Sequence, residues 1–253
     1  MKIGIVIPAR LESQRLPNKV LKKFLGISMI EHVWRRAVLA APNLPIVIAT
    51  DNIKIAKTCE SFGAKAIVTK KRHLSGTSRV GEISSKLNWD YYIVLQADEI
   101  LIEPRILRSL IRKLQKSRYV EFINVISPIM DKSELKDINI VKCVLRSNGS
   151  IISMFRESGL TCHINTQIKL TKKVSGVFAI SHSSLQKLSS RKRYEISTAE
   201  SIEQMKLIEL GIAVNSLICD HNFHSVNTNT EAISALRILQ TNSVQKKIMN
   251  NYI

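Results

Sequence analysis

The sequence predicts an α/β protein with a mostly parallel central sheet and helices on both of its faces. Its 253 residues are 45% hydrophobic and 23% charged, a composition that excludes wholesale disorder. Short apolar runs alternate with helical patterns through the first half, and repeated strand–helix units imply parallel strands joined by right-handed crossovers. The first run, residues 3–7, consists only of Ile, Val and Gly, as expected of a strand buried on both faces.

The remaining elements of the first half follow in order. Further strands are expected at residues 46–49, 66–69 and 91–95. Helices are expected at residues 29–41, 52–62, 76–88 and 104–116. The last of these helices begins at Pro104, and proline is favoured at the first helical position.

The second half has a different pattern. Strand-like segments at residues 121–127, 141–145, 151–155 and 174–180 follow one another without regular helices between them. A helix at 199–210, a strand at 212–217 and a closing helix at 231–239 complete the chain. We therefore expect one domain over residues 1–253, with an antiparallel or mixed β insert at about 121–195 that could serve as a dimerisation arm.

The charge of the chain invites a nucleic-acid hypothesis. There are 38 Lys and Arg residues against 20 Asp and Glu, a net charge of +18 with neutral histidines. However, the cations are spread along the chain, aromatic residues are only 5%, and no basic stripe is interleaved with aromatics. The pattern favours a solvated basic surface, suited to small polyanionic substrates, over a specific nucleic-acid site.

Other classes are also disfavoured. No stretch approaches the roughly 18 apolar residues of a membrane-spanning helix, and the first ten residues lack a signal-peptide cleavage site. The four cysteines form no C-x-x-C pair, so zinc and redox motifs are not indicated. We expect reduced thiols in a cytoplasmic protein without membrane insertion.

The loop after the first strand carries the first chemical signal. Arg10, Ser13, Arg15 and Lys19 lie within ten residues, where the first strand of a parallel sheet ends. Ligands bind at that edge of such sheets, and arginine forks and a lysine can hold a polyphosphate. A solvated basic turn would show the same residues.

Two more segments could share that edge. Asp98 follows the strand at 91–95, where one carboxylate with phosphate oxygens can hold Mg²⁺, although a strand-end turn would look alike. Ser75, Gly76 and Thr77 precede a helix whose N–H groups could bind an anion or a base edge. An ordinary capped helix explains that second segment equally well.

Together these segments resemble the 3-deoxy-manno-octulosonate cytidylyltransferase (CMP-Kdo synthetase) family over nearly the whole chain. The resemblance is carried by PARLESQRLPNKVL, GISMIEHVWRRA, IVIATDN, RHLSGTSRVGE, VLQADE, NIVKCVL, GVFAI and AESIEQMKLIELGI, in this order. It implies a Rossmann-like nucleotidyltransferase fold, Mg²⁺ as cofactor and a homodimer. It also implies transfer of CMP from CTP to a 2-keto-3-deoxy sugar acid with release of pyrophosphate, which supplies an activated sugar for lipopolysaccharide or surface polysaccharide.

The resemblance assigns roles to individual residues. The CTP triphosphate would be held by Arg10, Ser13, Arg15 and Lys19. Cytosine and ribose would be bound by Arg72, His73, Ser75, Gly76 and Thr77. The acceptor sugar acid would contact Gln96, Arg156 and Glu200. Lys19 and Asp98 would be catalytic, and the metal would be held by Asp98 and Asn227.

The chain departs from the family pattern at the second metal position, where Asn227 replaces an aspartate. An amide oxygen can ligate Mg²⁺ but brings no charge, so Glu99 or Asp220 could complete the shell. Alternatively, Asn227 only caps the following helix. The acceptor half also matches less well, with Val174, Phe178 and Ser197 where the family has His, Tyr and Glu. Two other hypotheses stay open: a nucleotide-binding homologue with weak or lost catalysis and, with less support, a basic nucleic-acid-binding protein.

Overall fold

The computed structural model describes residues 1–13, 15–70, 73, 75–117, 119–190, 194–220 and 225–252. Its strands are β1 (Ile3–Ala9), β2 (Lys23–Phe24), β3 (Ile27–Ser28), β4 (Ile46–Thr50), β5 (Lys65–Val68), β6 (Tyr91–Leu95), β7 (Phe122–Pro128), β8 (Lys142–Leu145), β9 (Ile151–Phe155), β10 (Thr171–Ser181) and β11 (Val214–Ile218). Its helices are η1 (Lys19–Leu21), α1 (Met29–Ala40), α2 (Ile53–Ser61), α3 (Gly76–Leu87), α4 (Pro104–Lys116), α5 (Lys132–Lys136), α6 (Ile164–Leu170), α7 (His182–Ser189), α8 (Glu195–Ala199), α9 (Met205–Glu209), α10 (Asn229–Thr241) and α11 (Ser243–Met249).

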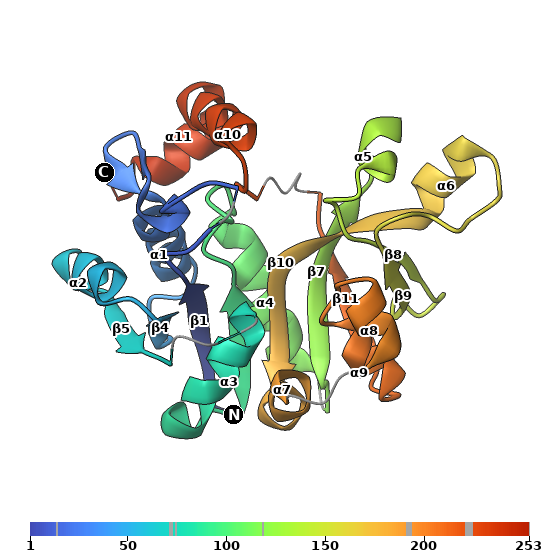
Figure 1. The fold of residues 1–253 in the computed structure, drawn as a ribbon, viewed down its shortest axis with the longest axis horizontal. Helices are drawn as coiled ribbons and strands as arrows, with labels where there is room; N and C mark the ends of the chain where they lie inside the picture. The colour runs from blue at the N-terminus through green and yellow to red at the C-terminus, as the bar shows by residue number, and fades with distance from the viewer. Residues whose placement is uncertain are drawn as a thin grey trace.

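A nine-stranded sheet forms the centre of the molecule, with strand order β11-β7-β10-β6-β1-β4-β5 and β8 and β9 attached to β10 (Figure 1). β1 pairs in parallel with β4 and β6, β4 with β5, and β7 with β11. Only β10 runs antiparallel to its neighbours β6 and β7 on this path. The prediction of a mostly parallel central sheet is confirmed.

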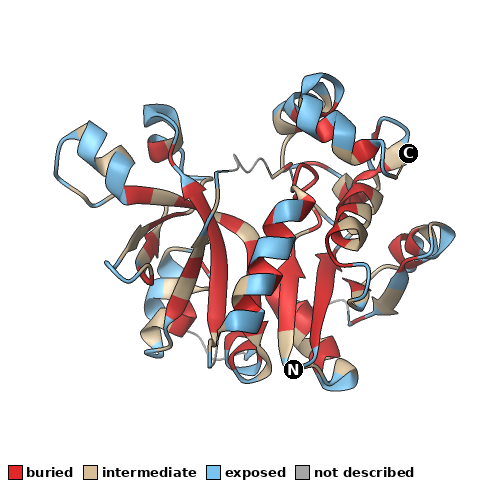
Figure 2. Cartoon of the chain, turned by 180° about the vertical axis from the view of Figure 1, so that it is seen from behind, coloured by how far each residue is buried: buried red, intermediate tan, exposed pale blue. Residues whose placement is uncertain are grey.

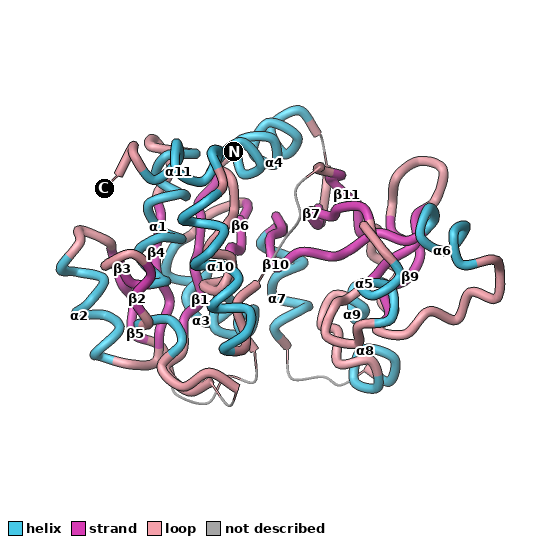
Figure 3. Tube along the Cα trace, turned by 90° about the horizontal axis from the view of Figure 1, so that it is seen from above, coloured by secondary structure: helices cyan, strands magenta, loops and turns pink. Residues whose placement is uncertain are grey.

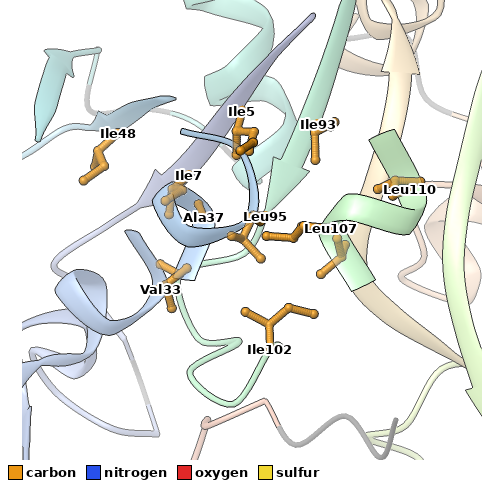
Figure 4. Packing of buried hydrophobic residues seen from close by; sticks show 14 of the residues in the cluster. Ile5, Ile7, Val33, Ala37, Ile48, Ile93, Leu95, Ile102, Leu107 and Leu110 are labelled. Atoms are coloured by element: carbon orange, nitrogen blue, oxygen red, sulfur yellow. The ribbon is translucent and has the colours of Figure 1, made fainter. Parts of the chain in front are cut away.

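Helices cover both faces of the sheet. Successive side chains of a strand point to opposite faces, so apolar residues on both faces need helices to pack against. Ile5 and Ile7 of β1 face the cluster that contains Val33 and Ala37 of α1 and the apolar side of α4 (Figure 4). Val6 faces the opposite cluster, with residues of α3, α7 and α9. Every residue of β1 is buried, and the exposed sides of the helices lie outward (Figure 2). The run at 3–7 is therefore a two-faced core strand, as predicted.

The mixed β region of the second half is built on β10. The first residues of this long strand pair with β8, and the last pair with β6, with a register shift between Val174 and Phe178. β10 thus extends from the main sheet toward β8, β9 and α6 (Figure 3). β7 and the second half of β10 lie on the path of strands from β11 to β5. The segment between them, which includes β8 and β9, projects from that path.

Two expectations for this half were wrong. Short helices α5 and α6 lie between the strands; they have 5 and 7 residues, too few for a helical period to show in the sequence. The helix expected at 199–210 is divided into the end of α8 and α9. Ser201 adopts a φ of 53° there, a left-handed conformation that a helix cannot continue through.

A third apolar cluster lies behind the loops at the carboxyl edge of the sheet. Leu16 and Phe24 pack there with Ile100 and Leu101, and with residues of α10 and α11. The C-terminal helices therefore support the loops that follow β1 and β6. Within the described ranges, no helix has the length and apolar character to cross a membrane.

Candidate active site

A pocket of about 430 Å³ opens at the carboxyl edge of the sheet. Four segments line it: the loop after β1, the start of α3, the residues after β6 and the segment before α10. Among the predicted site residues it brings together Arg10, Ser13, Arg15, Lys19, Ser75, Gly76, Gln96, Asp98 and Asn227. The topology explains this meeting, because β1 and β6 are adjacent parallel strands that end at the same edge.

The loop after β1 presents its cations because its apolar residues are anchored. Leu16 and Val20 are 4% and 3% exposed, and Arg15 and Lys19, each directly before one of them, are left to face the pocket. Asn18 reaches the left-handed region with a φ of 53° directly before Lys19. Asparagine tolerates that conformation better than most residues, and it turns the chain into η1.

Lys19 joins the two predicted metal positions. Its Nζ lies 2.8 Å from Asp98 Oδ2 and 2.9 Å from Asn227 Oδ1. Both side-chain oxygens therefore point to the same place, although their residues lie 129 positions apart, from 98 to 227. The side chains of Lys19 and Asp98 are 15% and 20% exposed, so the ion pair is shielded from bulk water.

Asn227 does not cap the helix that follows it. The N-cap of α10 is Thr228, whose side chain accepts from the amide of Glu231 at 3.2 Å. Glu231 completes a capping box, since its carboxylate accepts from the amides of Asn227 and Thr228. The capping alternative is therefore wrong for Asn227, and its side chain is free to face Lys19.

Neither carboxylate proposed to complete the metal shell lines the pocket. Glu99 is 1% exposed, and burial together with the nearby charge of Asp98 raises its pKa to about 7, with a partly opposing effect of hydrogen bonds from Ser225 and Gly176. Asp220 instead forms an ion pair with Arg105 at 3.0 Å. Within the described ranges, no group of three or more His, Cys, Asp or Glu side chains is placed to bind a metal.

The start of α3 contributes backbone and a small residue. Ser75 is the N-cap, with its side chain accepting from the amide of Ser78 at 3.1 Å. A Cβ on Gly76 would come within 3.1 Å of Pro8 and 3.2 Å of Gln96. Glycine therefore lets the start of α3 lie close to β1 and to the residue after β6. The capped helix expected here is present, and its first turn borders the pocket.

Two predicted nucleotide residues, His73 and Thr77, are described and are not among the residues that line the pocket. The ring of His73 contacts Glu82 Oε2 at 2.5 Å and Ser78 Oγ at 3.2 Å. Thr77 is 1% exposed and donates to Glu203 at 2.7 Å. Arg72 lies outside the described residues.

The predicted acceptor residues separate into two groups. Gln96 lines the pocket, whereas Arg156 and Glu200 contact each other elsewhere. The guanidinium of Arg156 donates to the carbonyl oxygens of Glu200, Ile138 and Ser201. Arg156 thus ties β9 to two neighbouring loops.

One contact joins the loop after β1 to the projecting region. Arg15 Nη1 donates to Asn139 Oδ1 at 3.2 Å. Sequence reasoning missed one pocket residue of note, Glu12, which places a carboxylate among the cations of the loop. Its position between Arg10 and Ser13 was the only available signal.

The residues present fit a hard divalent cation. Carboxylate and amide oxygens are ligands that Mg²⁺ accepts, and those of Asp98 and Asn227 already face one point. Mg²⁺ commonly takes one or two carboxylates and completes its shell with phosphate oxygens and water. Among the described residues, Asp98 brings the one carboxylate to this point, so a cation here would depend on phosphate oxygens and water to complete its shell.

This fold and this cation-lined edge define a nucleotide-binding α/β protein of the nucleotidyltransferase type. The model of the cytidylyltransferase family matches residues 4–216, and the chain belongs to this family. The chain is 30% identical to the 3-deoxy-manno-octulosonate cytidylyltransferase of Chlorobium limicola, over 95% of this chain and 98% of that protein. It is also 30% identical to the 8-amino-3,8-dideoxy-manno-octulosonate cytidylyltransferase of Shewanella pealeana, over 90% and 94% of the two chains.

A solved structure shows the same architecture. It is that of a CMP:2-keto-3-deoxy-manno-octonic acid synthetase complexed with CTP, with a TM-score of 0.88 and 30% identity. The match covers 95% of this chain and 99% of the other. The family resemblance inferred from the sequence motifs is confirmed.

Proposed function

We propose that the protein transfers CMP from CTP to 3-deoxy-manno-octulosonate or a closely related 2-keto-3-deoxy sugar acid, releasing pyrophosphate. The observation that carries the proposal is the convergence of Arg10, Arg15 and Lys19 with Asp98 in one pocket, in a chain of the cytidylyltransferase family. The relatives named above act on this acid or its 8-amino analogue, and the similar structure binds CTP.

The chemistry follows from the charges around the pocket. The anomeric hydroxyl of the sugar acid attacks the α-phosphorus of CTP and a new P–O bond forms. The bond between the α-phosphorus and the oxygen that bridges to the β-phosphate breaks, pyrophosphate leaves, and the hydroxyl proton passes to water. Arg10 and Arg15 bind the triphosphate, and Lys19 neutralises charge that develops on the leaving pyrophosphate. Positioning and charge neutralisation supply the rate enhancement, so no protein nucleophile is required.

Asp98 and Asn227 are the residues that would hold Mg²⁺, which when bound neutralises phosphate charge and makes the attacking hydroxyl more acidic. Lys19 reaches both of their oxygens. We propose that its ammonium moves toward the phosphates when nucleotide binds, since a flexible four-carbon stem allows it.

We further propose that Gln96 contacts the acceptor, while Arg156 and Glu200 shape the acceptor side from behind. Gln96 lines the pocket next to Asp98, whereas the side chain of Arg156 is occupied by three backbone carbonyls. The start of α3, at Ser75 and Gly76, is proposed to border the cytidine, with Arg72, His73 and Thr77 assigned there by resemblance.

The region at about 121–195 of this single domain is proposed to mediate a homodimer. Large apolar side chains are exposed on it, including Met130 at 65%, Ile138 at 54% and Leu170 at 50%. Burial of such surface stabilises association. Light scattering coupled to size exclusion should give twice the chain mass, and Met130→Lys should shift the measured mass toward that of the monomer.

We also propose a cytoplasmic location, where CTP is available.

The central experiment measures pyrophosphate release with CTP against a panel of 2-keto-3-deoxy sugar acids, including the 8-amino analogue, over a range of Mg²⁺. Activity with CTP and much less with UTP or ATP is expected. Equal stabilisation by CTP, UTP and ATP in a thermal shift assay would remove the support for a cytidylyltransferase of this specificity.

A second candidate is a nucleotide-binding homologue with poor turnover. It is favoured by Asn227, which leaves Asp98 as the one carboxylate that pairs with Lys19 in the part of the chain that the structure describes. Tight CTP binding without pyrophosphate release from any acceptor or metal would support it. Restored turnover in Asn227→Asp would then identify the missing charge as the cause.

A further inference from the structure

Glu99 is a buried carboxylate next to the site that the proposed chemistry does not use. Asp98 lines the pocket, whereas Glu99 points into the protein and is 1% exposed. Burial disfavours a carboxylate unless it makes hydrogen bonds that compensate for lost hydration. The contacts of Glu99 therefore indicate why a carboxylate stands there.

The first contact is with the bend of β10. Glu99 Oε1 accepts from the amide of Gly176 at 3.0 Å, in the interval where the pairing of β10 changes register. A Cβ at Gly176 would lie 2.7 Å from Gln96 Cγ and 2.9 Å from Glu99 Oε1. Only a residue without a side chain allows this approach, so Gly176 and Glu99 are matched to each other.

The second contact is with the segment before α10. The same Oε1 accepts from Ser225 Oγ at 2.9 Å. The amide of the next residue, Val226, donates to the carbonyl of Asp98 at 3.1 Å. The residue after that is Asn227, whose Oδ1 lies 2.9 Å from Lys19 Nζ. Two adjacent residues of the loop after β6 thus hold two adjacent residues of this segment.

We propose that Glu99 is a positioning residue, which sets the place of Asn227 relative to Asp98 by holding Ser225 and anchors both to the bend of β10 through Gly176. The inference rests on the proposed function, because it concerns where the two metal-facing oxygens stand. Glu99 is not among the residues that line the pocket. An amide ligand without charge depends more on correct placement than a carboxylate would, since Mg²⁺ retains its waters when ligands are poor.

The test uses two variants of the full chain, Ser225→Ala and Glu99→Gln. Each weakens the hydrogen bond from Ser225 Oγ to Glu99 Oε1. Mn²⁺ binding to the enzyme–CTP complex is measured by electron paramagnetic resonance, and the Mg²⁺ concentration for half-maximal pyrophosphate release by titration. Loss of one hydrogen bond changes an equilibrium constant by about threefold to tenfold. We expect Ser225→Ala to weaken metal binding by this factor. Glu99→Gln retains an acceptor oxygen, so a smaller shift is expected. CTP affinity without metal and turnover at saturating metal should stay at the wild-type values.

Ser184→Ala is the matched control. Ser184 donates to the carboxylate of Glu121, just before β7, at the opposite edge of the sheet from the pocket. This variant also loses a carboxylate–serine bond, so its melting temperature should fall without a change in metal binding.

Metal binding within twofold of wild type in a folded Ser225→Ala would overturn the proposal and leave Glu99 a purely structural role. Should Glu99→Gln fail to fold, Ser225→Ala still decides. A wild type that binds Mn²⁺ with CTP but releases no pyrophosphate would contradict the proposed function, while the Mn²⁺ measurement would still decide the role of Glu99.

Discussion

The proposed nucleotide side and the proposed acceptor side of this molecule are built differently. The nucleotide side lies where parallel strands β1 and β6 end, and its loops are anchored by buried residues such as Leu16 and Ile100. The acceptor side is reached through β10 and carries short helices, of which α6 buries no residue. A sheet edge fixes the groups that are proposed to bind phosphate, whereas a projecting arm can vary in shape without disturbing them.

The contrast predicts that single changes on the nucleotide side act on chemistry first. Lys19→Ala should lower kcat/KM for CMP transfer by about hundredfold to thousandfold, because a preorganised charge stabilises the transition state. Steady-state pyrophosphate release checks this. Lys22→Ala, three residues away on an exposed lysine that contacts Asn229, should stay near wild type. Equal losses in both variants would mean that the loop is sensitive to any change.

The packing behind the loops after β1 and β6 should lose stability at acidic pH. His32 is buried, and its ring contacts the carbonyl of Phe24 at 2.8 Å and the hydroxyl of Tyr252 at 2.9 Å. Burial lowers its pKa to about 4 from 6.5, opposed in part by the bond to Phe24. Between pH 6.5 and about 4, the unfolded chain therefore binds a proton at His32 that the folded chain does not bind.

Stability from this residue is present above pH 6.5 and is lost as the pH falls from 6.5 toward 4. The loss is on the order of 3 kcal/mol at about 1.4 kcal/mol for each pH unit. Urea unfolding across this window should show it, and His32→Gln should show a flatter pH profile. Because Glu99, with a raised pKa, changes stability in the opposite sense, the difference between wild type and variant is the measure.

Arg15→Ala should reduce CTP affinity by about tenfold to hundredfold. It removes a forked donor to phosphate, and a charge-assisted hydrogen bond contributes about 1.5–3 kcal/mol. Isothermal titration with CTP measures the effect. Arg237→Ala, on the exposed side of α10, is the matched control. Wild-type affinity in a folded Arg15→Ala would contradict the placement of the triphosphate.

Arg156→Ala tests the acceptor side. Loss of its bonds to Ile138, Glu200 and Ser201 should destabilise the fold by about 1–3 kcal/mol and raise the KM for the sugar acid, with CTP affinity unchanged. Thermal unfolding and initial rates with each substrate varied separately give the comparison. A parallel loss of CTP affinity would show that the two sides are coupled, for example through the contact of Arg15 with Asn139.

The smallest effect is expected at Asn227. Asn227→Asp adds a second carboxylate facing Lys19, and should lower the Mg²⁺ concentration for half-maximal activity by a few fold. Wild type should also be supported by Mn²⁺, which binds mixed ligands more tightly. An identical metal dependence in the two proteins would show that the amide oxygen is not a ligand.

Local sequence patterns located most of the fold. Strand β6 and helix α4 were predicted at their observed bounds, because a short apolar run and an amphipathic period are local properties. The break at Ser201 and the short helix α6 were not, since tertiary contacts and chain reversal decide them. For the site, motifs indicated Lys19 and Asp98 as candidate residues, and the meeting of their side chains fits the roles assigned by resemblance.

By itself, the sequence determined the alternation of strands and helices, the position of the cationic loop and the carboxylate after β6, because each depends on residues close together in the chain. The tertiary structure decided which distant residues meet. Asn227 reaches Lys19 because Thr228 caps α10 in its place and Val226 binds the loop of Asp98. Glu99 is turned away from the pocket because the bend of β10 at Gly176 offers it a donor. Contacts over such separations depend on how the sheet and the C-terminal helices pack, and no local pattern encodes them.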